Sequence, residues 1–205
     1  MRRKRGRRRI ALAITGASGS IYGLRVLEEL LRDRALEVHL TISAAAAKVL
    51  RYEHAIQVNL DRFDPRALKV RGAERAVYHH HEEIAAPLAS GSFRVEAMGI
   101  VPCSMGCAGK IAHGISGDLV ERAADVMLKE RRKLVLVPRE TPLSPVHLEN
   151  LLALARLGVT VLPAMPGFYG RPKRVEELVD FVVARVLDHL GVEHRLGPRW
   201  GERKN

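Results

Sequence analysis

A glycine-rich loop after a short apolar run carries the first residues whose types could do chemistry. Residues 10–14 have the length and composition of a strand buried on both faces, and Gly16, Ala17, Ser18 and Gly19 follow them. A helix that begins after such a loop presents unpaired N–H groups to an anion, and small side chains let a ligand approach the backbone. The loop therefore indicates a site for a phosphate-bearing cofactor; a compact turn without a ligand is the alternative. It matches neither the dinucleotide fingerprint G-x-G-x-x-G nor the nucleophile elbow G-x-S-x-G.

Two more strand patterns end in small or polar residues. Ser43 follows the alternating segment 37–42, and the run 102–110 follows the apolar segment 96–101. Ligands of open α/β sheets bind beyond the carboxyl ends of the strands, so these residues are predicted to face the same cleft as Ser18. Cys103 could act as a nucleophile there, but no His–Asp partner can be assigned to it. A buried, inert thiol is the favoured interpretation.

Charged side chains and a phenol complete the set of candidates. Arg139 and Glu140 follow the strand 133–137 on a proline-stiffened loop, where they could bind a cofactor and transfer a proton. Arg122 and Lys129 lie seven residues apart on the predicted helix 118–132 and share a face, which is also typical of an ordinary charged surface. Tyr169 lies in the loop after the strand 159–162.

The alternation of strand and helix patterns predicts an open α/β sheet in one domain. The length of 205 residues suits a single core, which we place at residues 10–190. Residues 1–9 are predicted to be a disordered basic arm. Residues 191–205 are predicted to be a tail that docks on an oligomer through the only tryptophan, Trp200.

Composition argues against several classes of protein. The net charge is +11, but residues 2–9 hold seven of the positive charges, which leaves +4 for the rest of the chain. Such an arm is more typical of a solvated tail than of an RNA-binding segment, and 4% aromatic residues indicate no base-stacking surface. The three adjacent histidines 79–81 are predicted to lie in a solvated loop without a metal ion. No apolar run is long enough to cross a bilayer, so a cytoplasmic protein with reduced thiols is expected.

Read together, these segments closely resemble the UbiX-type flavin prenyltransferases, formerly described as hydroxyarylic acid decarboxylases. The matching segments are GASG at 16–19, PCSM at 102–105, 121–131, VPRE at 137–140, HLEN at 147–150 and PGFY at 166–169. The likeness covers nearly the whole chain from Ile10 to Trp200. It implies a Rossmann-like (flavodoxin-like) three-layer sandwich that forms a homo-oligomer, commonly a dodecamer, with FMN between subunits. The implied reaction joins a dimethylallyl group from dimethylallyl monophosphate to N5 and C6 of reduced FMN, for use by a separate UbiD-type decarboxylase, and needs no metal.

The resemblance also implies roles for individual residues. Glu140 matches a carboxylate that shuttles protons, and Ser18 matches a residue near the reacting end of the flavin ring. Lys129 matches a third catalytic residue of the family. The positions that match contacts to the phosphate of the prenyl donor are Tyr169, Arg185, Arg122 and Lys129. The positions that match FMN contacts are Gly16, Ala17, Ser18, Ser43, Ser104, Met105, Gly106, Cys107 and Arg139.

Two positions depart from the family pattern, and two rival functions stay open. Cys107 stands where threonine is common, which affects one FMN contact, and Ile84 stands where some members have a tryptophan that walls the donor site. An FMN-dependent cysteine-type or aromatic acid decarboxylase shares the fold and the cofactor. A nucleic-acid-binding module is the other rival, because of the basic arm.

Overall fold

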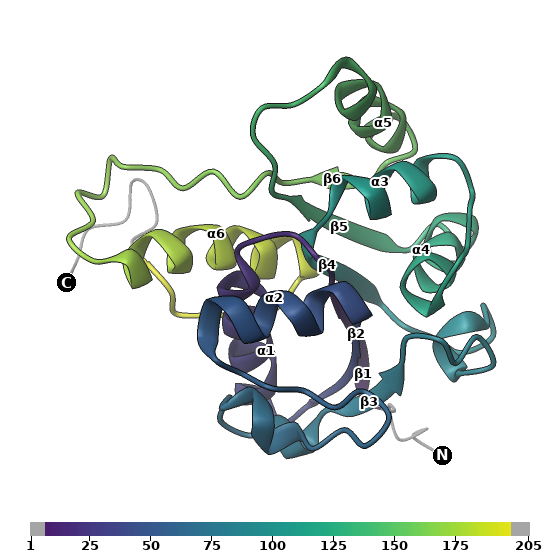
Figure 1. Ribbon diagram of the computed structural model, residues 1–205, viewed down its shortest axis with the longest axis horizontal. Coiled ribbons are helices and arrows are strands. Elements are labelled where there is room, and N and C mark those ends of the chain that lie inside the picture. The colour runs from purple at the N-terminus through teal and green to yellow at the C-terminus, as the bar shows by residue number, and fades with distance from the viewer. Residues whose placement is uncertain (1–6, 198–205) are drawn as a thin grey trace, which may run out of the picture.

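In the part of the chain that the structure describes, six parallel strands form one central sheet in the order β3-β2-β1-β4-β5-β6 (Figure 1). The computed structural model describes residues 7–197. The order reverses between β1 and β4, and this point is where open α/β sheets place their ligands. The strands are β1 (Arg8–Ile14), β2 (Leu36–Ile42), β3 (Val77–His80), β4 (Ala97–Cys103), β5 (Lys133–Pro138) and β6 (Thr160–Val161).

Helices cover both faces of the sheet, which confirms the predicted three-layer Rossmann-like sandwich. α1, α2 and α6 lie on one face, and α3, α4 and α5 lie on the other (Figure 1). The helices are α1 (Ser20–Arg32), α2 (Ala44–His54), α3 (Met105–Ala112), α4 (Leu119–Lys129), α5 (Pro145–Arg156) and α6 (Val175–Leu190). The short 3-10 helices are η1 (Pro65–Leu68), η2 (Ala73–Arg75) and η3 (Pro87–Ala89).

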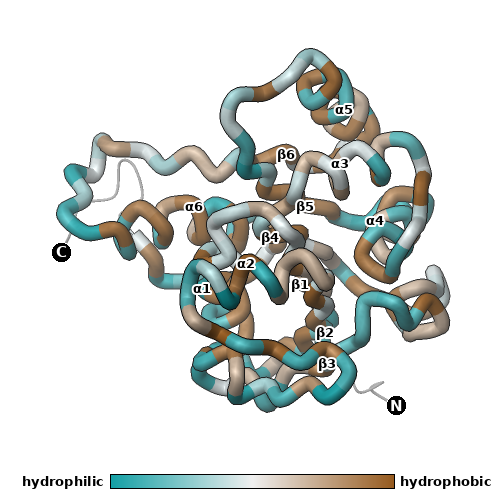
Figure 2. Tube along the Cα trace, in the orientation of Figure 1, coloured by the Kyte–Doolittle hydropathy of each residue, from teal (hydrophilic) through white to brown (hydrophobic). Residues whose placement is uncertain are grey.

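β1 shows why the core has two halves. Its residues alternate, so that Ile10, Leu12 and Ile14 pack with α1 and α6 while Ala11 and Ala13 pack with α3 and α4. The strands at the centre of the sheet are accordingly hydrophobic along their length (Figure 2). A strand that is buried on both faces gives a continuous apolar run, which explains why its position could be predicted.

The edge strand β3 corrects the prediction that residues 79–81 lie in a solvated loop. Val77–His80 pairs in parallel with β2, and the side chain of His79 is buried against His39. Nδ1 of His39 lies 2.8 Å from Nε2 of His79, and Nε2 of His39 lies 2.9 Å from a carboxylate oxygen of Glu37. A carboxylate only accepts, so neutral His39 donates from Nε2 and accepts at Nδ1 from His79. This strand buries polar rings instead of apolar ones, and its sequence therefore lacks a strand pattern.

The ends of the chain modify the predicted domain boundaries. β1 begins at Arg8, and Arg8 and Arg9 form ion pairs with Glu96 and Glu37 at 2.7 and 2.8 Å, so these two arginines belong to the sheet and not to the arm. At the other end, the apolar side chains of residues 192 and 196 are buried in the core beside α6. Residues 1–6 of the arm and Trp200 lie outside the described residues. Within residues 7–197, no helix is long and apolar enough to cross a membrane.

The histidine pair predicts a pH-dependent stability. Burial lowers the pKa of both His39 and His79, although Glu37 opposes the shift for His39 and Glu83 opposes it for His79. The unfolded chain therefore binds protons that the folded chain does not. This contribution to stability is complete above the ordinary histidine pKa of 6.5 and is lost as the pH falls below it.

We expect the substitution His79→Gln to remove part of this pH dependence, because glutamine can donate to His39 without titrating. The slope of the free energy of unfolding between about pH 7.5 and 5.5 should decrease by up to about 1.4 kcal/mol per pH unit. Denaturant unfolding at each pH measures it. The exposed His189→Gln serves as the control and should leave the slope unchanged; equal slopes for wild type and His79→Gln would refute the prediction.

Candidate active site

The loops after β1 and β4 are joined by one threonine at the point where the sheet order reverses. The Thr15 hydroxyl donates to the carbonyl of Pro102 at 2.9 Å and accepts from the backbone N–H of Ser104 at 2.8 Å. The Thr15 N–H donates to the same carbonyl at 3.2 Å. The side chain is buried, so these bonds are shielded from water. The two predicted ligand loops therefore form one surface.

Gly16 brings the first loop against the start of α2. A Cβ at this position would overlap the Cβ of Ala45, so only glycine allows the approach. Ser43 caps α2 by accepting from the N–H of Ala46 at 3.1 Å, and its own N–H donates to the carbonyl of Ile14 at 3.1 Å. Gly16 and Ser43 therefore lie at the same edge of the sheet.

The second loop begins α3 in the same way. The Ser104 hydroxyl accepts from the N–H of Cys107 at 3.3 Å, and Met105 and Cys107 are buried while Gly106 is exposed. The pKa of the Cys107 thiol is raised, mainly by its hydrogen bond with Cys103 and next by its burial. Both cysteines are free and buried, so the structure agrees with inert thiols rather than a nucleophile.

Arg139, the residue after β5, joins the loop that follows this strand to the first loop. Its Nε donates to the carbonyl of Ser18 at 3.0 Å, which ties the third loop to the first. Gly16, Ser18, Ser43, Ser104 and Arg139 thus meet at the carboxyl edge of the sheet, where the N-termini of α1, α2 and α3 are also found. Helix N-termini, small side chains and an arginine fit a phosphate-bearing ligand such as a flavin mononucleotide.

Glu53 is a residue of this site that the sequence did not reveal. It projects from the last turn of α2 and accepts from the N–H groups of Gly19 and Ser20 at 2.8 and 2.9 Å, and from the Ser20 hydroxyl at 2.6 Å. Burial alone would raise its pKa, but hydrogen bonds from Ser20, Ser18 and the two N–H groups outweigh burial and lower the pKa of Glu53. No local motif announces this role, because the partners are more than 30 residues away.

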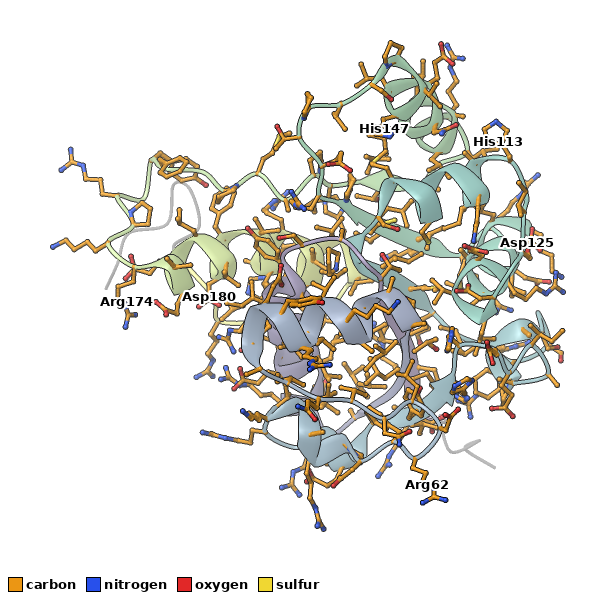
Figure 3. The ribbon with its side chains drawn as sticks, viewed as in Figure 1. Arg62, His113, Asp125, His147, Arg174 and Asp180 are labelled. Carbon is orange, nitrogen blue, oxygen red and sulfur yellow. The ribbon has the colours of Figure 1, made fainter. Side chains whose placement is uncertain are left out.

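The four residues matched to the prenyl-donor phosphate do not come together within one chain. Arg122 and Lys129 belong to α4, which packs on the Ala11 face of the sheet, whereas Arg185 belongs to α6 on the Ile10 face. Figure 3 marks the two helices by Asp125 on α4 and Asp180 on α6, on opposite sides of the molecule. One chain therefore brings the loop residues to one edge of the sheet but leaves these cations apart.

Each of these cations has its own local partner. Arg122 pairs with Asp125 at 2.8 Å, and Lys129 pairs with Glu130 at 3.2 Å at the end of α4. Because α4 leads into the start of β5, Lys129 lies toward the amino edge of the sheet, away from the ligand loops.

The other residues matched to the donor site or to proton transfer, Arg185, Tyr169 and Glu140, lie outside α4. Arg185 pairs with Asp188 at 2.8 Å. Tyr169 stands edge-on to Phe181 with ring centroids 5.7 Å apart, and Glu140 is exposed beside Arg139.

Comparison with known proteins places these features in a family. A family model described as Flavoprotein matches residues 1–187. The flavin prenyltransferase UbiX of Halalkalibacterium halodurans is 50% identical over 194 residues, which are 95% of this chain and 94% of that protein. The flavin prenyltransferase UbiX of Pseudomonas aeruginosa is 48% identical, over 96% of each chain.

Solved structures agree with the sequence relatives. A dodecameric FMN-dependent UbiX-like decarboxylase from Escherichia coli O157:H7 superposes with a TM-score of 0.86 at 42% identity, over 95% of this chain and all of that chain. AnUbiX (PadA1), in complex with FMN and dimethylallyl pyrophosphate, superposes with a TM-score of 0.80 at 41% identity, over 94% of this chain and 100% of that one.

The charge of Glu53 should stabilise the first loop measurably. The substitution Glu53→Gln keeps the shape but weakens the bonds to the α1 N-terminus, and we expect the free energy of unfolding at neutral pH to fall by about 1–2 kcal/mol. The pKa of Glu53 is lowered on folding, so its stabilisation is lost as the pH falls below the ordinary value of 4.5. Urea unfolding of wild type, Glu53→Gln and the exposed control Glu149→Gln tests this. A difference between wild type and Glu53→Gln that persists unchanged in acid would contradict the electrostatic account.

Proposed function

This chain belongs to the UbiX family of flavin prenyltransferases, and we propose that it joins the dimethylallyl group of dimethylallyl monophosphate to N5 and C6 of reduced FMN, releasing phosphate. The observation that carries the proposal is the set of loops tied together at the carboxyl edge by Thr15 and Arg139. These loops hold segments that resemble the family, such as GASG at 16–19 and PCSM at 102–105, and the relatives match over nearly the whole chain. We also propose that the product serves a UbiD-type decarboxylase and that the protein acts in the cytoplasm.

The flavin is proposed to lie against the carboxyl-edge loops. Gly16 and Ala17 would allow close approach, and Ser43 and Ser104 would direct the first turns of α2 and α3 toward the phosphate. Ser18 would lie near the reacting end of the ring, with its backbone fixed by Arg139. The proposed contacts in the second loop are Met105, Gly106 and Cys107. When bound, reduced FMN supplies the nucleophilic N5 and C6 atoms.

A second copy of the chain is proposed to complete the site. Lys129 and Arg185 lie on opposite faces of one chain, so a phosphate that touches both must lie between two chains. In the isolated chain these side chains are about half exposed, with relative accessibilities of 48% and 53%. Apolar side chains around Tyr169, namely Met165 and Phe168, are also exposed and would be covered in an oligomer.

The cations and the phenol are proposed to stabilise the departing phosphate. As the allylic C–O bond breaks, its electron pair leaves with the phosphate, and Arg122, Lys129, Arg185 and the Tyr169 hydroxyl would neutralise the growing charge. These groups supply the positive charge that the step needs, so the proposed reaction requires no metal ion. Glu140 is proposed to shuttle protons for the ring closure: the prenyl double bond would take up one proton as its other end bonds to C6, and the proton on C6 would then be released.

The direct test is an anaerobic incubation of the protein with dithionite-reduced FMN and dimethylallyl monophosphate. The mass of the released flavin is then measured by mass spectrometry. The proposal predicts a flavin heavier by one prenyl group and one inorganic phosphate released for each. Unmodified flavin would refute it. Carbon dioxide release from an aromatic acid or a peptidyl cysteine by this protein alone would favour the decarboxylase instead.

Glu140 can be tested separately from binding. Glu140→Gln should slow prenylation by about 100-fold or more, because the amide cannot accept the proton. The affinity for FMN should stay within about twofold, since the substitution is isosteric. The exposed Glu193→Gln is the matched control and should react at the wild-type rate. A Glu140→Gln variant that keeps full activity would assign the proton to another acceptor, such as the released phosphate.

A further inference from the structure

Two arginines hold the backbone of the loop 89–93. Nε of Arg122 donates to the carbonyl of Ala89 at 3.3 Å. The guanidinium of Arg132 donates to the carbonyl of Gly91 and, at 3.0 Å, to the carbonyl of Phe93. The Arg132 side chain is only 17% exposed, and its contact with Glu130 is longer, at 3.7 Å. The guanidinium of Arg132 therefore forms its hydrogen bonds with the loop backbone, and its contact with a carboxylate is a longer one.

The loop in turn lies directly against the end of α4. A Cβ at Gly91 would overlap the carboxylate of Glu130 and would lie 3.1 Å from Nζ of Lys129. Gly91 has no positive φ, so an added Cβ would act only by displacing the flexible ends of Glu130 and Lys129 and not through backbone strain. The Lys129 ammonium, which pairs with Glu130 at 3.2 Å, is thus confined on one side by the loop.

We propose that Arg132 is a positioning residue for the prenyl-donor site: by fixing Gly91 and Phe93 it holds the loop 89–93 against Lys129 and Glu130 and so sets where the Lys129 ammonium stands. The inference rests on the proposed function in one respect, that Lys129 meets the donor phosphate. The guanidinium of Arg132 presents two nitrogen atoms in a fixed planar arrangement, one to each carbonyl, whereas the ammonium of a lysine donates from a single nitrogen atom. A cation that is displaced by even 1 Å loses much of its effect on a departing phosphate.

The test compares three variants with a matched control. Arg132→Ala removes the guanidinium, Arg132→Lys keeps the charge, and Gly91→Ala pushes on Glu130 and Lys129 without removing a charge. Arg94→Ala removes an exposed arginine next to the loop and is the control. We expect KM for dimethylallyl monophosphate to rise about tenfold in Arg132→Ala and Gly91→Ala and less in Arg132→Lys. The affinity for FMN should stay within about twofold, and Arg94→Ala should match wild type.

A role limited to stability would lower the melting temperature of Arg132→Ala while leaving KM unchanged in both Arg132→Ala and Gly91→Ala, and that result would overturn the proposal. Calorimetric titration of the FMN-loaded protein with inorganic phosphate separates this inference from the proposed function. If wild type binds phosphate but forms no prenylated flavin, the proposed function fails, and Arg132 is judged by whether Arg132→Ala weakens phosphate binding about tenfold. If wild type binds neither phosphate nor donor, both proposals fail.

Discussion

The buried hydroxyl of Thr15 connects the two halves of the sheet at the place where the strand order reverses. It joins the loop after β1 to the loop after β4 through bonds of 2.8 and 2.9 Å, while Gly16 lets α2 approach from the other side. Parallel strands bring their carboxyl ends to one edge, but they do not by themselves fix loops to each other. Thr15, Gly16 and the bond from Arg139 to Ser18 supply that fixation, and the flavin site proposed here depends on it.

The cationic side chains matched to the donor phosphate do not gather at one edge of the sheet as the loops do. The cations of α4 and α6 are divided between the two faces of the sheet, where each is paired with a nearby carboxylate and open to water. Exposed charges contribute little electrostatic stabilisation, because water screens them. The same cations would act far more strongly once a neighbouring chain excludes water. Assembly and catalysis are therefore linked in this account by the dielectric environment of a few side chains.

The strands of the core and the meeting of their loops at one edge of the sheet could be predicted from the sequence, whereas the flavin contacts of those loops stay a prediction. Buried parallel strands such as β1 give continuous apolar runs, and the small residues after them point to a ligand edge. β3 could not be predicted in this way, because its buried side chain is His79, whose burial depends on a hydrogen bond to His39 from another strand. The roles of Glu53 and Arg132 could not be predicted for a related reason. Their partners are backbone groups more than 30 residues away in the sequence, and no local spacing of residues indicates such contacts. The division of Lys129 and Arg185 between two faces likewise follows from topology and not from any motif.

The central claim, that two chains build one donor site, is tested most directly by subunit complementation. Lys129→Ala and Arg185→Ala, each of which we expect to be inactive alone, would be coexpressed with different affinity tags. Oligomers carrying both tags would then be assayed for flavin prenylation. Random assembly leaves about a quarter of the shared sites with both native residues, so about a quarter of the wild-type activity should return. Coexpression of Lys129→Ala with Arg122→Ala, which damage the same helix, should restore nothing. Mixed Lys129→Ala and Arg185→Ala oligomers with no activity beyond that of either variant alone would contradict the account and place the whole site within a single chain.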